Sequence, residues 1–169
     1  MERIMKTTLV IYGSSTGTCE SIASTIASKL GAKAIDVTSV TEDDVRGADN
    51  LILGTSTWGA GYMQDDWYDG VKLLKKVGLQ GKTVAIFGCG DSESYSDTFC
   101  GGMRELYDAA LGAGATVVGS VSTDGYTFDD SASAENGEFV GLALDDVNES
   151  DKTEERIDAW LDAVKPQLA

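Results

Sequence analysis

The sequence lacks several features that mark common classes of protein. Among its 169 residues are no histidine, one proline and three cysteines, Cys19, Cys89 and Cys100. An odd number of widely spaced cysteines argues against a disulfide framework and favours free thiols in the cytoplasm. Without histidine or a Cys-x-x-Cys pair, a zinc or iron–sulfur site has few ligands, so we expect no metal site.

Positive charge is also scarce. Lys and Arg number 13 against 28 Asp and Glu, for a net charge of −15. Phosphate backbones and anionic lipid repel so acidic a chain, so nucleic acid and membranes are poor candidates as partners, and a basic protein is a good one. No apolar run is long enough for a signal peptide core or a membrane span. Linker-like and repetitive segments are absent too, which favours one domain over residues 1–169.

What the chain does contain is an alternation of short apolar runs with amphipathic segments. The apolar runs predict strands at 8–12, 34–37, 51–53, 83–87 and 115–121. Helical spacing predicts helices at 22–30, 67–77, 99–110 and 157–164, with a brief helix after Thr41. Thr41 with Asp44, and Asp151 with Glu154, have the spacing of capping boxes. Strands that alternate with helices indicate an α/β fold with a doubly wound parallel sheet.

One segment breaks this alternation. Residues 122–139 are polar and rich in turn-forming residues, and another apolar run follows at 140–144. We interpret the segment as an excursion from the fifth strand, which then resumes. Its acidic residues lack the alternating spacing and central glycine of a calcium loop.

Ligands of doubly wound sheets bind beyond the carboxyl ends of the strands, which directs attention to loops 13–18, 55–66 and 88–98. The first loop, Gly-Ser-Ser-Thr-Gly-Thr, joins a strand to a helix and is rich in hydroxyl groups. Backbone N–H groups at such a helix N-terminus bind anions. The loop has no lysine for a nucleoside triphosphate and no Gly-x-Gly-x-x-Gly pattern, so it suits one terminal monophosphate.

The other two loops each carry an aromatic residue among small ones. Trp58 stands in the second loop and Tyr95 in the third. Two aromatic rings at one edge of the sheet favour a flat ring system clamped between them. Together with the phosphate loop, they predict a site for a mononucleotide.

These motifs resemble the three cofactor-binding loops of flavodoxins. The resemblance rests on Ser14-Ser15-Thr16-Gly17-Thr18, on Thr57-Trp58, and on Gly90-Asp91 followed by Tyr95. The stretch from residue 122 to 151 is similar to the insertion of long-chain flavodoxins. The resemblance implies a five-stranded parallel sheet in the order 2-1-3-4-5, with helices on both faces, the insertion in the fifth strand, and FMN bound at the carboxyl edge.

The resemblance also implies roles for particular residues. The phosphate would lie on Ser14, Ser15, Thr16, Gly17, Thr18 and Cys19, where relatives usually end the loop in Thr rather than Cys. The flavin ring would lie between Trp58 and Tyr95. The remaining residues expected at the cofactor are Ser56, Thr57, Gly59, Ala60, Gly61, Cys89, Gly90, Asp91, Asp97 and Cys100. Cys89 and Cys100 are expected to be small packing residues rather than redox groups.

By the same resemblance, the function is electron transfer rather than catalysis. The expected protein is a monomeric, low-potential one-electron carrier with non-covalently bound FMN, whose semiquinone and hydroquinone are its working states. Its partners would be a basic-faced flavodoxin reductase and low-potential acceptor proteins. The alternative is an FMN-dependent NAD(P)H:quinone oxidoreductase of the same fold, which turns over NAD(P)H without a separate reductase.

Overall fold

A parallel sheet forms the centre of the protein in a computed structural model, which describes residues 7–13, 17–58 and 62–168. Its strands follow the order β10-β5-β3-β1-β2. They are β1 (Thr8–Gly13), β2 (Lys33–Asp36), β3 (Asn50–Trp58), β5 (Thr83–Cys89) and β10 (Leu142–Leu144). The short strand β4 (Tyr62–Met63) runs antiparallel to the end of β3. With β5 as the fourth strand of the core and β10 in the fifth position, the expected order 2-1-3-4-5 is confirmed.

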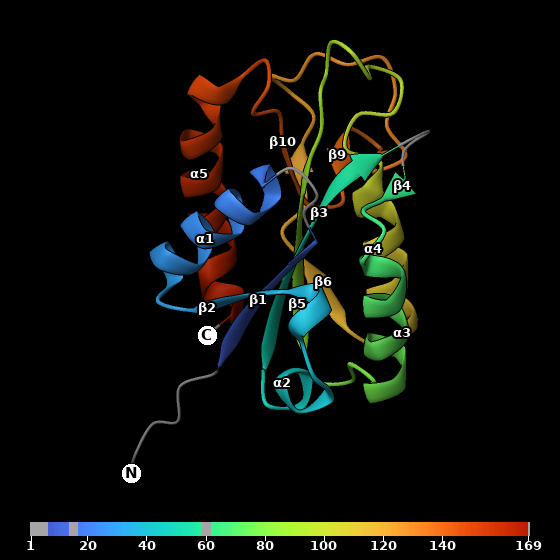
Figure 1. The fold of residues 1–169 in the computed structure, drawn as a ribbon. Coiled ribbons are helices and arrows are strands. Elements are labelled where there is room, and N and C mark those ends of the chain that lie inside the picture. The colour runs from blue at the N-terminus through green and yellow to red at the C-terminus, as the bar shows by residue number, and fades with distance from the viewer. Residues whose placement is uncertain (1–6, 14–16, 59–61, 169) are drawn as a thin grey trace.

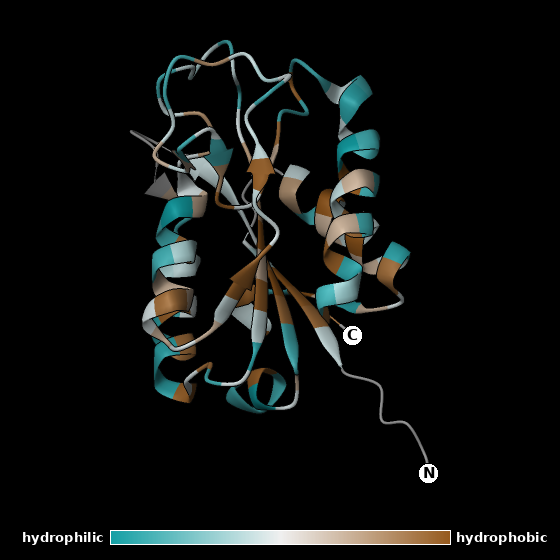
Figure 2. Ribbon diagram, turned by 180° about the vertical axis from the view of Figure 1, so that it is seen from behind, coloured by the Kyte–Doolittle hydropathy of each residue, from teal (hydrophilic) through white to brown (hydrophobic). Residues whose placement is uncertain are grey.

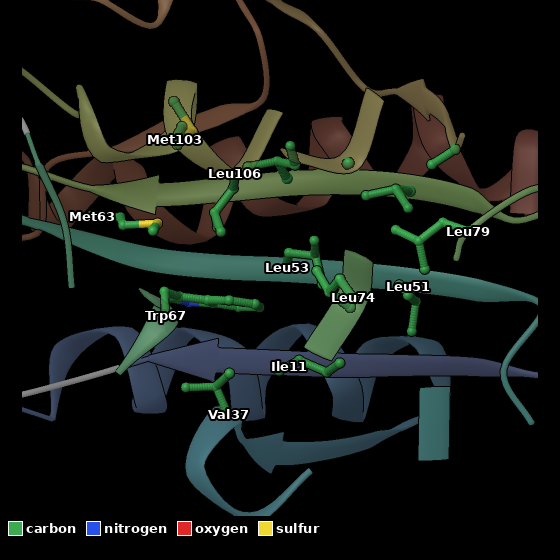
Figure 3. Packing of buried hydrophobic residues seen from close by; sticks show 14 of the residues in the cluster. Ile11, Val37, Leu51, Leu53, Met63, Trp67, Leu74, Leu79, Met103 and Leu106 are labelled. Atoms are coloured by element: carbon green, nitrogen blue, oxygen red, sulfur yellow. The ribbon is translucent and has the colours of Figure 1, made fainter. Parts of the chain in front are cut away.

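Helices cover both faces of the sheet (Figure 1). They are α1 (Thr18–Leu30), α2 (Glu42–Arg46), α3 (Trp67–Val77), α4 (Gly102–Gly112) and α5 (Ser150–Leu168). Successive strand residues point to opposite faces, and each face has its own core. Val10 and Ile52 pack with residues of α1 and α5. Ile11 and Leu53 pack with residues of α3 and α4, including the buried Trp67 (Figure 3).

This two-sided burial explains the continuous apolar runs of the strands. Val10, Ile11, Leu51, Ile52 and Leu53 are fully buried, so both faces of β1 and β3 are covered along these central residues. In Figure 2 the strands are brown at the centre, whereas the helices carry hydrophilic residues on their outer sides.

Two separate segments occupy the fifth strand position. The strand β6 (Thr116–Val118) pairs with residues 83–85 of β5, and β10 pairs with residues 87–89. Between them the chain forms a small antiparallel sheet of β7 (Val121–Ser122), β9 (Glu138–Phe139) and β8 (Ala134–Glu135). The predicted excursion and return of the fifth strand are therefore confirmed. The first half ends earlier than predicted, because Gly119 turns with φ 89° and its carbonyl accepts a hydrogen bond from Trp160 Nε1.

Several other element boundaries also differ from the prediction. Val37 lies in a short 3-10 helix (Val37–Ser39), where Asp36 accepts a bond from the Thr38 N–H and ends β2. Phe99 precedes α4, which begins only at Gly102. The prediction of a capping box at Asp151 and Glu154 is wrong. The helix α5 already begins at Ser150, and the Glu154 carboxylate forms an ion pair with Lys29 at 3.3 Å instead.

The parallel strands all end at one edge of the sheet. The loops after β5 and β10 rise together at that edge, and α2 lies at the opposite end (Figure 1). None of the helices in the described ranges is both long and apolar enough to cross a lipid bilayer.

Candidate functional site

The helix α1 begins where β1 ends, so its N-terminus lies at the carboxyl edge of the sheet. Gly17 precedes the helix with φ 91°, a left-handed conformation that glycine adopts at little cost. Gly17 has no side chain with which to bond the first N–H groups of the helix itself. Those N–H groups and the helix dipole favour an anion at this point. Ser14, Ser15 and Thr16, the hydroxyl residues expected to bind phosphate, lie outside the described residues.

The end of β3 supplies the second part of the site. Thr57 Oγ1 accepts a hydrogen bond from the Gly102 N–H at the start of α4, at 3.1 Å. The buried Thr55 Oγ1 donates to the Ser56 carbonyl at 2.8 Å and accepts from the Gln64 N–H at 2.9 Å. These bonds fix the strand end against its neighbours. Trp58 is described only in its backbone, and Gly59, Ala60 and Gly61 lie outside the described residues.

The loop after β5 is held by Asp91. Its Oδ1 accepts bonds from the N–H groups of Glu93 at 3.1 Å and Ser94 at 2.9 Å, and from Asn148 Nδ2 at 2.8 Å. The Ser94 N–H above all, with the Asn148 amide, lowers the pKa of Asp91, so the carboxylate is charged at neutral pH. Gly90 is needed just before it, because a Cβ there would lie 2.8 Å from the Cys100 nitrogen.

These loops enclose a pocket of about 240 Å³ at the carboxyl edge. The predicted site residues that line it are Thr18, Ser56, Thr57, Cys89, Gly90, Asp91, Tyr95 and Cys100. The structure thus brings together residues from all three loops that the sequence indicated. Gly17 directly precedes Thr18 at the N-terminus of α1.

Besides Gly17, two other predicted residues whose side chains the structure describes do not line this pocket. Cys19 is fully buried, and its thiol faces that of Cys89 in the core, so only its backbone N–H remains for a phosphate. Asp97 is exposed. The preceding Ser96 carbonyl accepts bonds from the N–H groups of Asp129 and Asp130, which ties this part of the loop to the insertion instead of the pocket.

Four further residues line the pocket that the sequence reading missed: Thr98, Phe99, Asp146 and Val147. Thr98 is the last residue of the candidate loop 88–98 but was not named as a site residue, and Phe99 was assigned to the helix predicted at 99–110. Asp146 and Val147 follow β10, and the rule that ligands bind beyond strand ends would have found them if the fifth strand had been included.

One polar atom at the pocket has no partner within the described part of the chain. Thr98 Oγ1 is buried and makes no hydrogen bond there. A buried hydroxyl without a partner is costly, so a polar ligand in the pocket would satisfy it. The N-terminus of α1, the apolar surface of Phe99 and this hydroxyl together suit a ligand that has an anionic end, a flat apolar body and polar edges.

The three cysteines are all free and buried. Contact with Cys89, followed by burial, raises the pKa of the Cys19 thiol well above its ordinary value. Burial does the same for Cys100. Buried cysteines react slowly, which agrees with packing roles for Cys89 and Cys100. Over the described ranges, no three His, Cys, Asp or Glu side chains form a group that could hold a metal ion.

Comparison with known proteins gives consistent matches over nearly the whole chain. The family model described as Flavodoxin matches residues 10–160. Flavodoxin 1 of Azotobacter vinelandii is 39% identical over 94% of this chain and 95% of its own length. A flavodoxin of Enterobacter agglomerans is 42% identical over 97% of this chain and 99% of its own length.

A solved structure agrees with these sequence matches. The crystal structure of Fusobacterium nucleatum flavodoxin bound to flavin mononucleotide has a TM-score of 0.89 to this fold and 34% sequence identity. The similarity covers 96% of this chain and 99% of that one. The sheet order, the split fifth strand and the pocket described above are thus set in a fold that is known to hold a flavin nucleotide in that relative.

Proposed function

The chain belongs to the flavodoxin family and is an FMN-dependent electron carrier, and we propose that the pocket at the carboxyl edge of its sheet is where FMN binds. The observation that supports this most is the convergence of eight predicted residues on one pocket beside the N-terminus of α1. FMN, when bound, accepts and releases electrons one at a time. As a flavodoxin, the protein carries electrons and turns over no substrate of its own, so we infer no catalytic residues.

We infer that different kinds of protein group contact the phosphate and the flavin ring of the cofactor. The N–H groups of Thr18 and Cys19 would bind the phosphate with residues 14–16 of the same loop. Tyr95, Phe99 and the end of β3 would cover the flavin ring and exclude water from it. The Thr98 hydroxyl would gain a partner at the polar edge of the ring.

The charge around the pocket favours the oxidised cofactor. Asp91 and Asp146 line it, and no lysine or arginine of the described residues does. A negative charge that appears on reduction would be repelled by these carboxylates, which lowers the reduction potential. This is the basis on which we propose a low-potential carrier.

The rim of the pocket indicates the kind of partner. Tyr95 is 58% and Val147 69% exposed, and both lie at the pocket beside Asp91 and Asp146. Exposed apolar groups within an acidic rim suit a partner with a complementary basic face, which electrostatic attraction would guide to the pocket. Flavodoxins exchange electrons with reductases and acceptor proteins, and we propose that this protein does so as a cytoplasmic monomer with basic-faced partners.

The first test is binding of FMN by the purified protein, followed by anaerobic reduction under a spectrophotometer. We expect tight binding of FMN and reduction in two separate one-electron stages. Riboflavin is the matched control, because it lacks only the phosphate. Each hydrogen bond to a charged group contributes about 1.5–3 kcal/mol, so riboflavin should bind at least about tenfold more weakly.

The same sample separates a carrier from a quinone reductase. We expect no oxidation of NAD(P)H by the FMN-loaded protein until a flavodoxin reductase is added. Rapid bleaching by NAD(P)H alone would show an enzyme instead. Equal affinity for FMN and riboflavin would contradict the proposed phosphate site.

A further inference from the structure

A buried carboxylate directly precedes two pocket residues in the chain, at a position that the proposed function does not use. Asp145 follows the last residue of β10 and is 0% exposed. It does not itself line the pocket, although the next two residues, Asp146 and Val147, do. A buried carboxylate is costly unless it is fully hydrogen-bonded, so its partners show what it holds in place.

The partners of Asp145 come from two loops. Its Oδ2 accepts bonds from the Ser92 N–H at 3.1 Å, from the Ser92 hydroxyl, and from Asn148 Nδ2 at 3.0 Å. Its Oδ1 accepts from the N–H groups of Val147 at 3.2 Å and Asn148 at 2.9 Å, and from Asn148 Nδ2 at 3.2 Å. Ser92 is 53 residues away in sequence, so this carboxylate joins the loop after β5 to the loop after β10.

The Asn148 side chain extends the network to the pocket wall. Its Nδ2 also donates to Asp91 Oδ1 at 2.8 Å. Asp91 and Tyr95 belong to the loop after β5, Asp146 and Val147 belong to the loop after β10, and all four line the pocket. The two loops are therefore connected at the pocket through Asp145, Ser92 and Asn148.

All the groups around the carboxylate are donors, which explains why an acid stands here. Burial alone would raise the pKa of Asp145, but the bonds from Ser92 and Asn148 outweigh burial and hold the pKa below its ordinary value. In an asparagine at position 145, one of the two accepting oxygens is replaced by an NH₂ group, which is itself a donor and would face the N–H groups that the oxygen now accepts from. The substitution would leave at least one buried backbone N–H without an acceptor.

We propose that Asp145 is a positioning residue for the FMN pocket, which holds the loop of Asp91 and Tyr95 in a fixed position against the loop of Asp146 and Val147. This inference rests on the proposed function, since the pocket must be the FMN site. It makes Asp145 a residue that sets cofactor affinity without touching the cofactor.

The sign of the effect separates positioning from simple charge repulsion. FMN carries a negatively charged phosphate, so removing a nearby negative charge would strengthen its binding if electrostatics alone mattered. Loss of positioning weakens binding instead. The variant Asp145→Asn removes the charge and keeps the shape, so the two explanations predict opposite changes in the dissociation constant.

The experiment measures the FMN dissociation constant from quenching of flavin fluorescence, for wild type, Asp145→Asn and Ser92→Ala. We expect at least a tenfold weaker affinity for Asp145→Asn and a smaller loss, about threefold, for Ser92→Ala, which removes one donor. The visible circular dichroism of bound FMN should also change in Asp145→Asn, because the loops around the ring have moved. The matched control is Asp44→Asn, which removes a hydrogen-bonded carboxylate in α2 and should change the affinity less than twofold.

Each outcome has a defined meaning. Unchanged or tighter FMN binding by folded Asp145→Asn, with only a lower melting temperature of the apoprotein, would overturn the proposal and leave Asp145 a purely structural residue. If Asp145→Asn fails to fold, the affinity of Ser92→Ala decides in the same way. Failure of the wild type to bind FMN would refute the proposed function itself, and the positioning role with it.

Discussion

At the scale of single residues, we expect Thr98 to link the stability of the protein to the binding of its cofactor. Its hydroxyl is buried and has no hydrogen-bond partner within the described residues, although the residue lines the pocket. Such a group destabilises the empty protein and becomes favourable when a ligand satisfies it. A substitution at Thr98 should therefore act in opposite directions on the apoprotein and on FMN binding.

The substitution Thr98→Val removes the hydroxyl and keeps the shape of the side chain. We expect FMN binding to weaken by about 1 kcal/mol, or roughly fivefold, because one hydrogen bond is lost. The free energy of unfolding of the apoprotein should stay the same or rise by up to about 1 kcal/mol. Fluorescence titration with FMN and urea denaturation of the apoprotein measure the two quantities.

Thr55→Val is the matched control for this prediction. The Thr55 hydroxyl is bonded on both sides, to the Ser56 carbonyl and the Gln64 N–H. Its removal should lower the unfolding free energy of the apoprotein by about 1–2 kcal/mol. An unchanged FMN affinity in Thr98→Val would show that the hydroxyl does not serve the cofactor.

The residues of the site were predictable from sequence only where a motif or a strand end marks them. Thr18, Asp91 and Tyr95 stand in such loops, and the structure places them at one pocket. Asp145 and Asn148 give no local signal, because their importance comes from distant contacts: Asp145 bonds Ser92 across 53 residues of sequence, and Asn148 bonds Asp91 across 57. Cys19 was predicted at the right loop, but the helical geometry of α1 turns its side chain into the core.

At the scale of elements, α2 shows what local sequence alone can specify. Thr41 and Asp44 form the predicted capping box: the Asp44 N–H donates to Thr41 Oγ1 at 3.2 Å, and the Thr41 N–H donates to Asp44 Oδ2 at 2.9 Å. The Thr41 N–H is the main cause that lowers the pKa of Asp44. This short helix lies at the end of the sheet opposite the pocket loops (Figure 1).

Thr41→Ala should therefore cost stability and leave the cofactor site unaffected. Loss of an N-cap costs about 1 kcal/mol, and in a domain of this size that lowers the melting temperature by roughly 2–4 °C. FMN affinity should stay within twofold of the wild type. Thermal unfolding followed by circular dichroism, together with FMN titration, tests both statements.

Thr41→Ser provides the control, because serine caps helices about as well as threonine. It should restore most of the stability that alanine loses. A melting temperature as low as that of the alanine variant would mean that packing of the threonine methyl, rather than the cap, accounts for the loss.

Elements that depend on distant contacts were predicted less well. The helix from Trp67 to Val77 was predicted with its observed bounds, since its apolar face and its ends are local signals. The end of β6 was missed, because it is set by Gly119 and its bond to Trp160 in α5, 41 residues away. The two-residue strands β7, β8 and β9 are likewise defined by pairing with one another, which no local pattern encodes.

At the scale of the whole molecule, a net charge of −15 acts on the folded state as well as on partners. Like charges held close together in the compact chain destabilise it by self-repulsion. Most of the described ion pairs are exposed, as in Lys72 with Asp69, and contribute little to stability. Salt screens both kinds of interaction. It should therefore stabilise the fold, because it weakens the repulsion between like charges by more than it weakens the attraction within ion pairs.

We expect the melting temperature at pH 7 to rise by several degrees when sodium chloride increases from 10 to 500 mM, because the Debye length falls from about 30 Å to under 5 Å. Repeating the measurement at pH 4 provides the control. That pH lies close to the isoelectric point of about 4.1, so the net charge and the effect of salt should both be much smaller. An equal rise at both pH values would show a general salt effect on apolar burial, and would mean that self-repulsion of the acidic surface does not limit the stability of this fold.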